Sequence, residues 1–154
     1  MKFRERVQAT PALAKTLKNG LQALLPDDRG RIECKNPRAL AGSVNVDAVL
    51  KEVLPNAPRW DYVIGIHIDK NSDRVIWIEV HPASSHHIND VLVKLQWLKN
   101  WLKTDAPRLD ELPREFVWIA SGMVAIPPGS PQRKKLAERG LVFAGSRFVI
   151  KTFS

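Results

Sequence analysis

The sequence predicts an α/β fold, more narrowly α+β: a single domain with a mixed central β-sheet, a β-hairpin at its core and helices packed on it. Two runs, 60–68 and 75–81, are rich in β-branched and aromatic residues, which favour strands. Residues 69–73 between them, Asp-Lys-Asn-Ser-Asp, have strong turn chemistry, so the two runs are expected to form a hairpin. A continuous apolar face at helical spacing then predicts a long helix. Its positions are Ile88, Val91, Leu92, Leu95, Leu98 and Leu102.

The segments before the hairpin suggest two helices and a short strand. A helix is expected over 10–24, where a Thr-Pro start is followed by leucines at helical spacing. A short strand is expected over 31–35. A second, shorter helix over 45–54 has either Asn45 or Asp47 as its cap.

The segments after the hairpin complete the predicted α+β pattern. A helix over 84–103 leads to a strand over 116–120. A basic helix over 130–140 begins at Ser-Pro and ends at glycine. The runs 141–143 and 147–150 flank Ala-Gly-Ser, which suggests a small terminal hairpin.

Length and composition fit one globular domain, 1–154. The chain is long enough for one sizeable core, and 44% hydrophobic and 26% charged residues are ordinary for such a domain. Its longest apolar runs are far below the roughly 20 residues of a membrane span, so no membrane partner is expected. The single cysteine, Cys34, excludes a disulfide within the chain, and with no signal core after the N-terminus it favours a cytoplasmic location.

Positive charge is concentrated at the two ends of the chain. The net charge is +8; residues 1–38 carry nine Lys/Arg against four Asp/Glu, and 131–154 carry six against one. The segment 39–130 carries nine against eleven. This distribution suits a nucleic acid that rests on basic flanks while an acidic centre holds cations, although a solubilising surface would have the same composition.

Two carboxylates at the ends of the hairpin strands are the principal candidate site. Asp61 begins the first strand, and Glu79 lies near the end of the second, followed by Val80 and His81. A charge in an otherwise apolar strand is costly to bury unless it is paired or binds a metal. Carboxylates on adjacent strands could therefore form a divalent-metal site.

This order of elements resembles the PD-(D/E)xK, or restriction-endonuclease-like, nuclease superfamily. Asp61 matches the first acid and Glu79 the second, while His81 stands where the family has lysine. The resemblance covers about 45–121 and implies a restriction-endonuclease-like core there, with a basic N-terminal region, 1–38, and a basic C-terminal region, 130–154. The segments Trp-Asp-Tyr and Glu-Val-His-Pro also look like those of uncharacterised bacterial proteins to which no activity is attached.

The resemblance implies a nuclease that uses Mg²⁺ or Mn²⁺ to hydrolyse the phosphodiester bonds of DNA or RNA. Asp61 and Glu79 would be metal ligands, with the backbone carbonyl of Val80 as a third. His81 could act as the general base, or Lys94 on the next helix could replace the missing lysine. On the preceding helix, Glu52 is a candidate outer acid.

Strand parity decides whether the two acids can meet. Side chains alternate between faces, so Asp61 and Glu79 share a face only if opposed residues have numbers that sum to an even value. A three-residue loop, 70–72, satisfies this condition and places Asp61 across from His81. A two- or four-residue loop separates the acids unless a bulge intervenes.

Other functions remain open from the sequence. A degenerate site would leave a catalytically silent protein that binds nucleic acid or a protein partner in a regulatory, defence or immunity role, and an unrelated small α/β domain is a further alternative. A zinc site at Glu79, His81, His86 and His87 fits no common ligand spacing.

Two surface features of the helices bear on partners. Trp97 and Trp101 lie one turn apart and could stack on bases, although packing against the sheet or in a homodimer is the commoner use of such a pair. The cluster Arg133, Lys134, Lys135 and Arg139 is the densest basic segment and is expected to contact phosphates, unless it is simply a solvated face.

Overall fold

The β-hairpin predicted from the sequence forms the centre of the computed structural model, which describes residues 2–152. Its strands belong to a five-stranded sheet in the order β2-β3-β4-β5-β6. The strands are β2 (Leu40–Asn45), β3 (Tyr62–His67), β4 (Asp73–Ala83), β5 (Arg114–Val124) and β6 (Leu141–Phe143). The pairs β2–β3 and β3–β4 are antiparallel, and β4–β5 and β5–β6 are parallel, so the sheet is mixed as expected.

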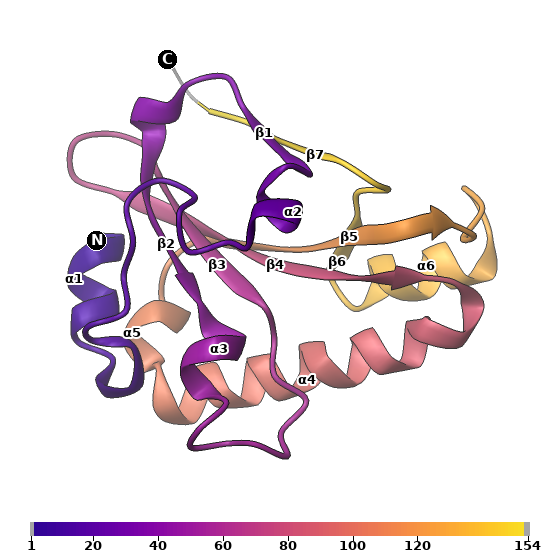
Figure 1. Cartoon of the computed structure of the whole chain (residues 1–154), viewed down its shortest axis with the longest axis horizontal. Helices are drawn as coiled ribbons and strands as arrows, with labels where there is room; N and C mark the ends of the chain where they lie inside the picture. The colour runs from indigo at the N-terminus through magenta and orange to yellow at the C-terminus, as the bar shows by residue number, and fades with distance from the viewer. Residues whose placement is uncertain (1, 153–154) are drawn as a thin grey trace.

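The helices connect these strands, and all of them except α2 (Pro26–Arg29), which lies on the side of β1 (Ile32–Cys34), pack on one face of the sheet (Figure 1). They are α1 (Phe3–Gln8), α2 (Pro26–Arg29), α3 (Val46–Leu50), α4 (Ile88–Asp105), α5 (Pro107–Asp110) and α6 (Pro131–Glu138). Short 3₁₀ turns occur at Pro11–Leu13, Pro37–Ala39 and Ser85–His87. In Figure 1, α4 runs along the lower side of the sheet, and the strand pair β1 (Ile32–Cys34) and β7 (Phe148–Ile150) lies on the upper side.

The two faces of the sheet bury separate apolar clusters. Odd-numbered residues of β3 and β4, such as Val63 and Trp77, pack with α1 and α4. Even-numbered residues, such as Ile64 and Ile76, pack under β1 and β7. Because side chains alternate along a strand, the face on which a polar side chain lies is decided by the parity of its number.

The N-terminal helix α1 is attached to the hairpin by two contacts. The backbone N–H of Phe3 donates to Oδ2 of Asp73 over 2.7 Å, and Asp73 is itself fully buried and contacts Nδ1 of His67 over 2.8 Å. The ring of Phe3 lies against Gly65, where a Cβ atom would be 2.2 Å from Cδ2 of the phenylalanine. Any side chain at position 65 therefore displaces α1.

The N-terminal part of the structure differs from the sequence-based prediction in one helix and one strand. The helix predicted over 10–24 is absent beyond Leu13, because Lys18 leaves to exchange both backbone hydrogen bonds with Ser43 and Gly20 has φ +52°. The bridge to Ser43 extends the sheet, so tertiary pairing overrides the leucine spacing. The strand β2 was not predicted, because its sequence, Leu-Ala-Gly-Ser-Val-Asn, has a weak strand pattern.

The predicted C-terminal hairpin is also wrong. Residues 141–143 form β6, which pairs in parallel with β5, and residues 148–150 form β7, which pairs in parallel with β1. The two segments thus join different sheets, and β7 closes over the face opposite α4. The basic helix is confirmed as α6, with Ser130 capping it through a bond from the Arg133 N–H.

No helix within residues 2–152 has the length and apolar character required to cross a membrane.

Replacing Gly65 by alanine is expected to destabilise the protein by about 1–3 kcal/mol, because the new methyl group overlaps the Phe3 ring. Urea unfolding measures this change. Gly30→Ala is the matched control, since its Cβ would meet only ordinary contacts at 3.6 Å. Equal stabilities of the two variants would contradict the close packing of α1.

Candidate functional site

Asp61 and Glu79 lie opposite one another on the face of the sheet that carries α4. The pair Tyr62–Ile78 fixes the register, and it places Asp61, one residue before β3, across from Glu79. The sum of opposed residue numbers is even, so the parity condition is met. None of the loop lengths considered from the sequence is the one observed: Ile68 to Ser72 separate the strands, and Asp61 faces Glu79, whereas a three-residue loop would have placed it across from His81.

Each of the two carboxylates accepts a hydrogen bond from the neighbouring strand. The Asp61 N–H donates to Oε1 of Glu79 over 3.2 Å, and the Val80 N–H donates to Oδ2 of Asp61 over 2.9 Å. In a strand, the N–H and C=O of one residue point to the same side. The Val80 carbonyl is therefore directed towards the side of Asp61.

Lys94 brings a positive charge into the site from α4. Its Nζ donates to Oε2 of Glu79 over 2.5 Å, and Glu79 is completely buried, while 23% of the Lys94 side chain is exposed. Val91, Leu95 and Leu98 hold the apolar face of α4 on the sheet, and Lys94 lies between them in the helical repeat. Lys94, the candidate for replacing the missing lysine, thus contacts the second acid, and its proposed catalytic role stays a prediction.

The electrostatics of the site favour a protonated Asp61. Burial, and then the negative charge of Glu79, raise the pKa of Asp61 from 3.8 to about 8, against the opposing effect of Lys94. For Lys94, burial would lower the pKa, but attraction and hydrogen bonding to Glu79 outweigh it and raise the pKa above its usual value. Near neutral pH the site therefore contains a neutral Asp61 beside the Glu79–Lys94 ion pair.

His81 lies at the edge of this group. Its Nδ1 is 3.6 Å from Oε2 of Glu79, and its buried Nε2 has no hydrogen-bond partner within residues 2–152. The ring packs edge-to-face on His87 with centroids 5.2 Å apart, and the Trp118 indole N–H donates to the His81 carbonyl over 3.0 Å. The imidazole is thus held in place but retains one unused nitrogen.

Asp47, and not Glu52, is the acidic residue of the α3 region that lies close to the carboxylate pair. Glu52 lies beyond the end of α3 and is exposed. Asp47, inside α3, lies near enough for its charge to raise the pKa of both Asp61 and Lys94, and its N–H donates to the Asp61 carbonyl over 3.2 Å. Arg59 pairs with Asp47 over 2.9 Å. The sequence suggested only a capping role for Asp47, and in the structure Asn45 caps α3 by accepting from the Ala48 N–H.

The four residues of the predicted basic cluster on α6 have different environments in the structure. Arg133 stacks over Phe143 at 4.6 Å and donates to the Ile126 carbonyl over 3.4 Å, so its guanidinium is engaged within the fold. Lys134, Lys135 and Arg139 are exposed, and Lys135 contacts Asn89 of α4 over 3.3 Å. The basic side of α6 therefore lies beside the first turns of α4, which follow the site strand β4.

The tryptophan pair of α4 and the histidines of the alternative zinc site are the remaining candidates from the sequence. Trp97 and Trp101 are stacked with centroids 5.9 Å apart, and Trp101 is buried in the core, so the pair is packed as the commoner reading expected. His86 is exposed, and Nδ1 of His87 bonds to Oγ of Ser84 over 2.7 Å. Within residues 2–152 no group of three or more His, Cys, Asp or Glu side chains is arranged to hold a metal ion.

Comparison of the chain with protein-family models, curated proteins and solved structures finds no match.

Stability at high pH is expected to depend on Asp61. An acid whose pKa is higher in the folded state stabilises the fold at low pH, and this contribution is lost as the pH rises from about 4 towards 8. Asp61→Asn keeps the neutral form at every pH. Relative to wild type, its free energy of unfolding should therefore increase by about 2–4 kcal/mol between about pH 5 and 8.

Denaturant unfolding at several pH values measures this difference. Asp90→Asn, at an exposed position on α4, is the control and should follow the wild-type curve. Parallel curves for Asp61→Asn and wild type would contradict a raised pKa of Asp61.

Proposed function

We propose that this protein is a divalent-metal-dependent phosphodiesterase of the nuclease type that acts on DNA or RNA. The observation that carries the proposal is the placement of Asp61 and Glu79 opposite one another on adjacent strands, with Lys94 bonded to Glu79. Acidic groups that meet in this way, with one pKa strongly raised and a lysine beside them, are typical of catalytic sites.

The order of the elements supports the resemblance to the PD-(D/E)xK superfamily. The resemblance implies a helix, a hairpin that carries both acids, a helix on the sheet and a further strand. In this chain α3, the β3–β4 hairpin, α4 and the parallel strand β5 follow one another in that order. Lys94 also brings a lysine to the second acid although position 81 is histidine.

The donor set is suited to a hard cation such as Mg²⁺ or Mn²⁺. Asp61, Glu79 and the Val80 carbonyl would hold it, since these ions are bound through one or two carboxylates, with water and substrate oxygens completing the shell. When bound, such an ion polarises a phosphate and lowers the pKa of a water molecule. Asp61 must release its proton to act as a ligand, so metal affinity should rise with pH.

The remaining side chains have distinct roles in this proposal. The Lys94 ammonium is partly exposed and can offset negative charge that develops on the phosphate. The His81 imidazole, whose Nδ1 faces Glu79 and whose buried Nε2 has no partner within residues 2–152, is the candidate general base. The leaving oxygen takes its proton from solvent.

A second candidate function has its own supporting observation. Glu79 is fully buried and already neutralised by Lys94. A carboxylate satisfied in this way can serve the fold alone, which favours a catalytically silent protein that binds nucleic acid through α6 or binds a protein partner.

A cleavage assay separates the two functions. Purified protein is incubated with plasmid, single-stranded DNA and RNA, with Mg²⁺, Mn²⁺ or chelator. We expect metal-dependent cleavage of at least one substrate, reduced at least about 100-fold in Asp61→Asn because a metal ligand is lost. This variant preserves the neutral form present in the folded protein, so loss of activity would not reflect loss of the fold.

Asp90→Asn is the control for that assay and should retain wild-type activity. Absence of cleavage on all three substrates would support the binding protein instead, and full activity of Asp61→Asn would exclude Asp61 as a metal ligand of the reaction.

The exposed basic side of α6 is expected to contact phosphates. Replacing Lys134, Lys135 and Arg139 together by glutamine should weaken nucleic-acid binding and reduce the slope of log affinity against log salt by about 2–3, because up to three phosphate contacts are lost. Fluorescence anisotropy at three salt concentrations, with chelator present, measures both quantities. A triple glutamine variant at exposed Lys51, Lys70 and Lys103 is the matched control. Equal slopes for the two triple variants would exclude α6 as the contact surface.

A further inference from the structure

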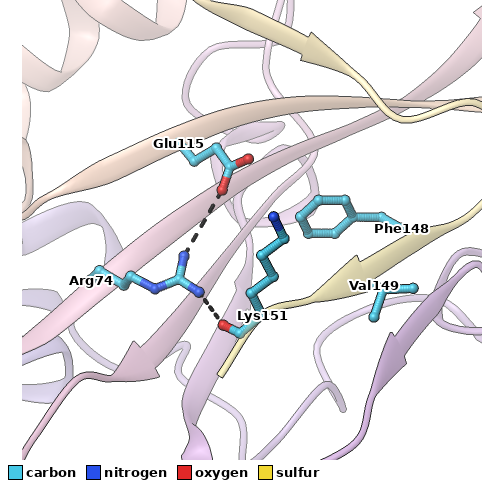
Figure 2. A pocket seen from close by; sticks show the side chains of 5 residues that line it. All are labelled: Arg74, Glu115, Phe148, Val149 and Lys151. Atoms are coloured by element: carbon cyan, nitrogen blue, oxygen red, sulfur yellow. Dashed lines mark hydrogen bonds and ion pairs between the residues drawn. The ribbon is translucent and has the colours of Figure 1, made fainter. Parts of the chain in front are cut away.

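A second candidate site lies on the face of the sheet opposite the carboxylates. A cavity of about 340 Å³ opens between the sheet and β7, and Figure 2 shows the side chains around it. Arg74 comes from β4 and Glu115 from β5, while the C-terminal segment contributes the remaining three. These are Phe148, Val149 and Lys151. Because Arg74 is even-numbered and Glu79 odd-numbered on the same strand, the cavity and the carboxylates are separated by the sheet.

The Arg74 guanidinium has hydrogen-bonding capacity that its partners do not use. Nη2 donates to the Lys151 carbonyl, and Nη1 is 3.9 Å from Oε2 of Glu115, which is longer than a hydrogen bond. Its Nε is buried and has no partner within residues 2–152. A buried donor without an acceptor is costly, and only 16% of the Arg74 side chain is exposed. Nη1, which has no acceptor among residues 2–152 within hydrogen-bond distance, is therefore suited to an additional anionic acceptor in the cavity.

Lys151 adds a second positive charge to the cavity. It is exposed, and its ammonium has no partner within the described part of the chain. Lys151, Phe148 and Glu115 all line the cavity, as Figure 2 shows. Two cations against one carboxylate make the cavity net positive, and a half-buried aromatic ring forms one wall.

We propose that this cavity binds a mononucleotide. The phosphate would be held by Arg74 and Lys151, because a guanidinium is the preferred partner of a phosphate and a lysine reinforces it. The base would lie against Phe148 and Val149, since bases stack on aromatic side chains without strong sequence preference. The Glu115 carboxylate can accept a hydrogen bond from an amino group of the base. The cavity volume falls within the range of small-molecule sites.

This binding site is independent of the proposed nuclease reaction. None of the five lining residues belongs to the carboxylate site, and the two sites occupy opposite faces of the sheet.

Calorimetric titration of the 1–154 chain in chelator tests the proposal, because chelator excludes metal-dependent hydrolysis. The probes are AMP, adenosine and inorganic phosphate. We expect AMP to bind at least about tenfold more tightly than either of the others, since it alone offers both the charge and the ring. Lys151→Gln should weaken AMP binding about tenfold and adenosine binding little. Phe148→Leu should weaken AMP at least about fivefold and phosphate little.

Two control variants locate the binding. Lys103→Gln, at an exposed position on α4, and Asp61→Asn, on the opposite face, should both bind AMP as wild type does. Arg74 is kept unchanged because it also anchors the backbone at Lys151. Phosphate that binds as tightly as AMP, AMP affinity unchanged by Lys151→Gln, or no AMP binding would each overturn the proposal. A loss of AMP binding in Asp61→Asn would assign the nucleotide to the carboxylate site and would overturn it as well.

Discussion

The ion pair between Glu79 and Lys94 is the interaction on which the centre of this structure depends. Glu79 is completely buried, and beside Asp61 and His81 its neighbours on this face of the sheet are apolar side chains such as Trp77. Removing a carboxylate from water costs several kcal/mol, which only a close opposite charge and good hydrogen bonds offset. Lys94, 2.5 Å away, and the Asp61 N–H supply both. The rotation of α4 about its axis is consequently set by the need to present Lys94 to the strand, together with the apolar residues around it.

The neutralisation of Glu79 by Lys94 relates the stability of the fold to its proposed function. Asp61 lies across from a charge that is already paired, and it stays protonated near neutral pH because burial and Glu79 both oppose its ionisation. A bound divalent cation would reverse this balance, since its charge favours the ionised form of both acids. A site of this kind can be stable without a metal ion and can also bind one. The burial of Glu79 is therefore compatible with both proposed functions. His81 and Asp47, at the border of the pair, extend the polar group towards solvent.

The sheet separates two chemically different environments. On the α4 face, buried acids are paired with a lysine, and exposed basic residues of α6 lie nearby. On the other face, β1 and β7 cover an apolar layer, and Arg74 at its border faces Lys151 and Glu115. The period of two along β4 produces this separation, because Arg74 and Glu79 differ in parity. One strand thus contributes to a candidate catalytic site and to a candidate ligand cavity without contact between them.

The sequence by itself determined the local elements whose residues have strong intrinsic preferences. The β-branched runs of β3 and β4, the apolar face of α4, and the Ser-Pro start of α6 were predicted because each pattern repeats with the period of the element it forms. The sequence also identified Asp61, Glu79 and Lys94 as candidate site residues, because a charge next to an apolar run is costly to bury without a partner. Parity showed that the acids could share a face, but not which register they would adopt.

Only the tertiary structure decided the elements that depend on distant partners. Residues 14–24 lost their expected helix because Lys18 pairs with Ser43, and β6 and β7 pair with strands that are far away in the sequence. Contacts between remote segments likewise place Asp47 rather than Glu52 near Asp61 and stack Arg133 on Phe143. They also form the cavity around Arg74. Local preferences amount to a few tenths of a kcal/mol per residue, whereas backbone pairing and burial are each larger, so the non-local contacts prevail wherever the two conflict.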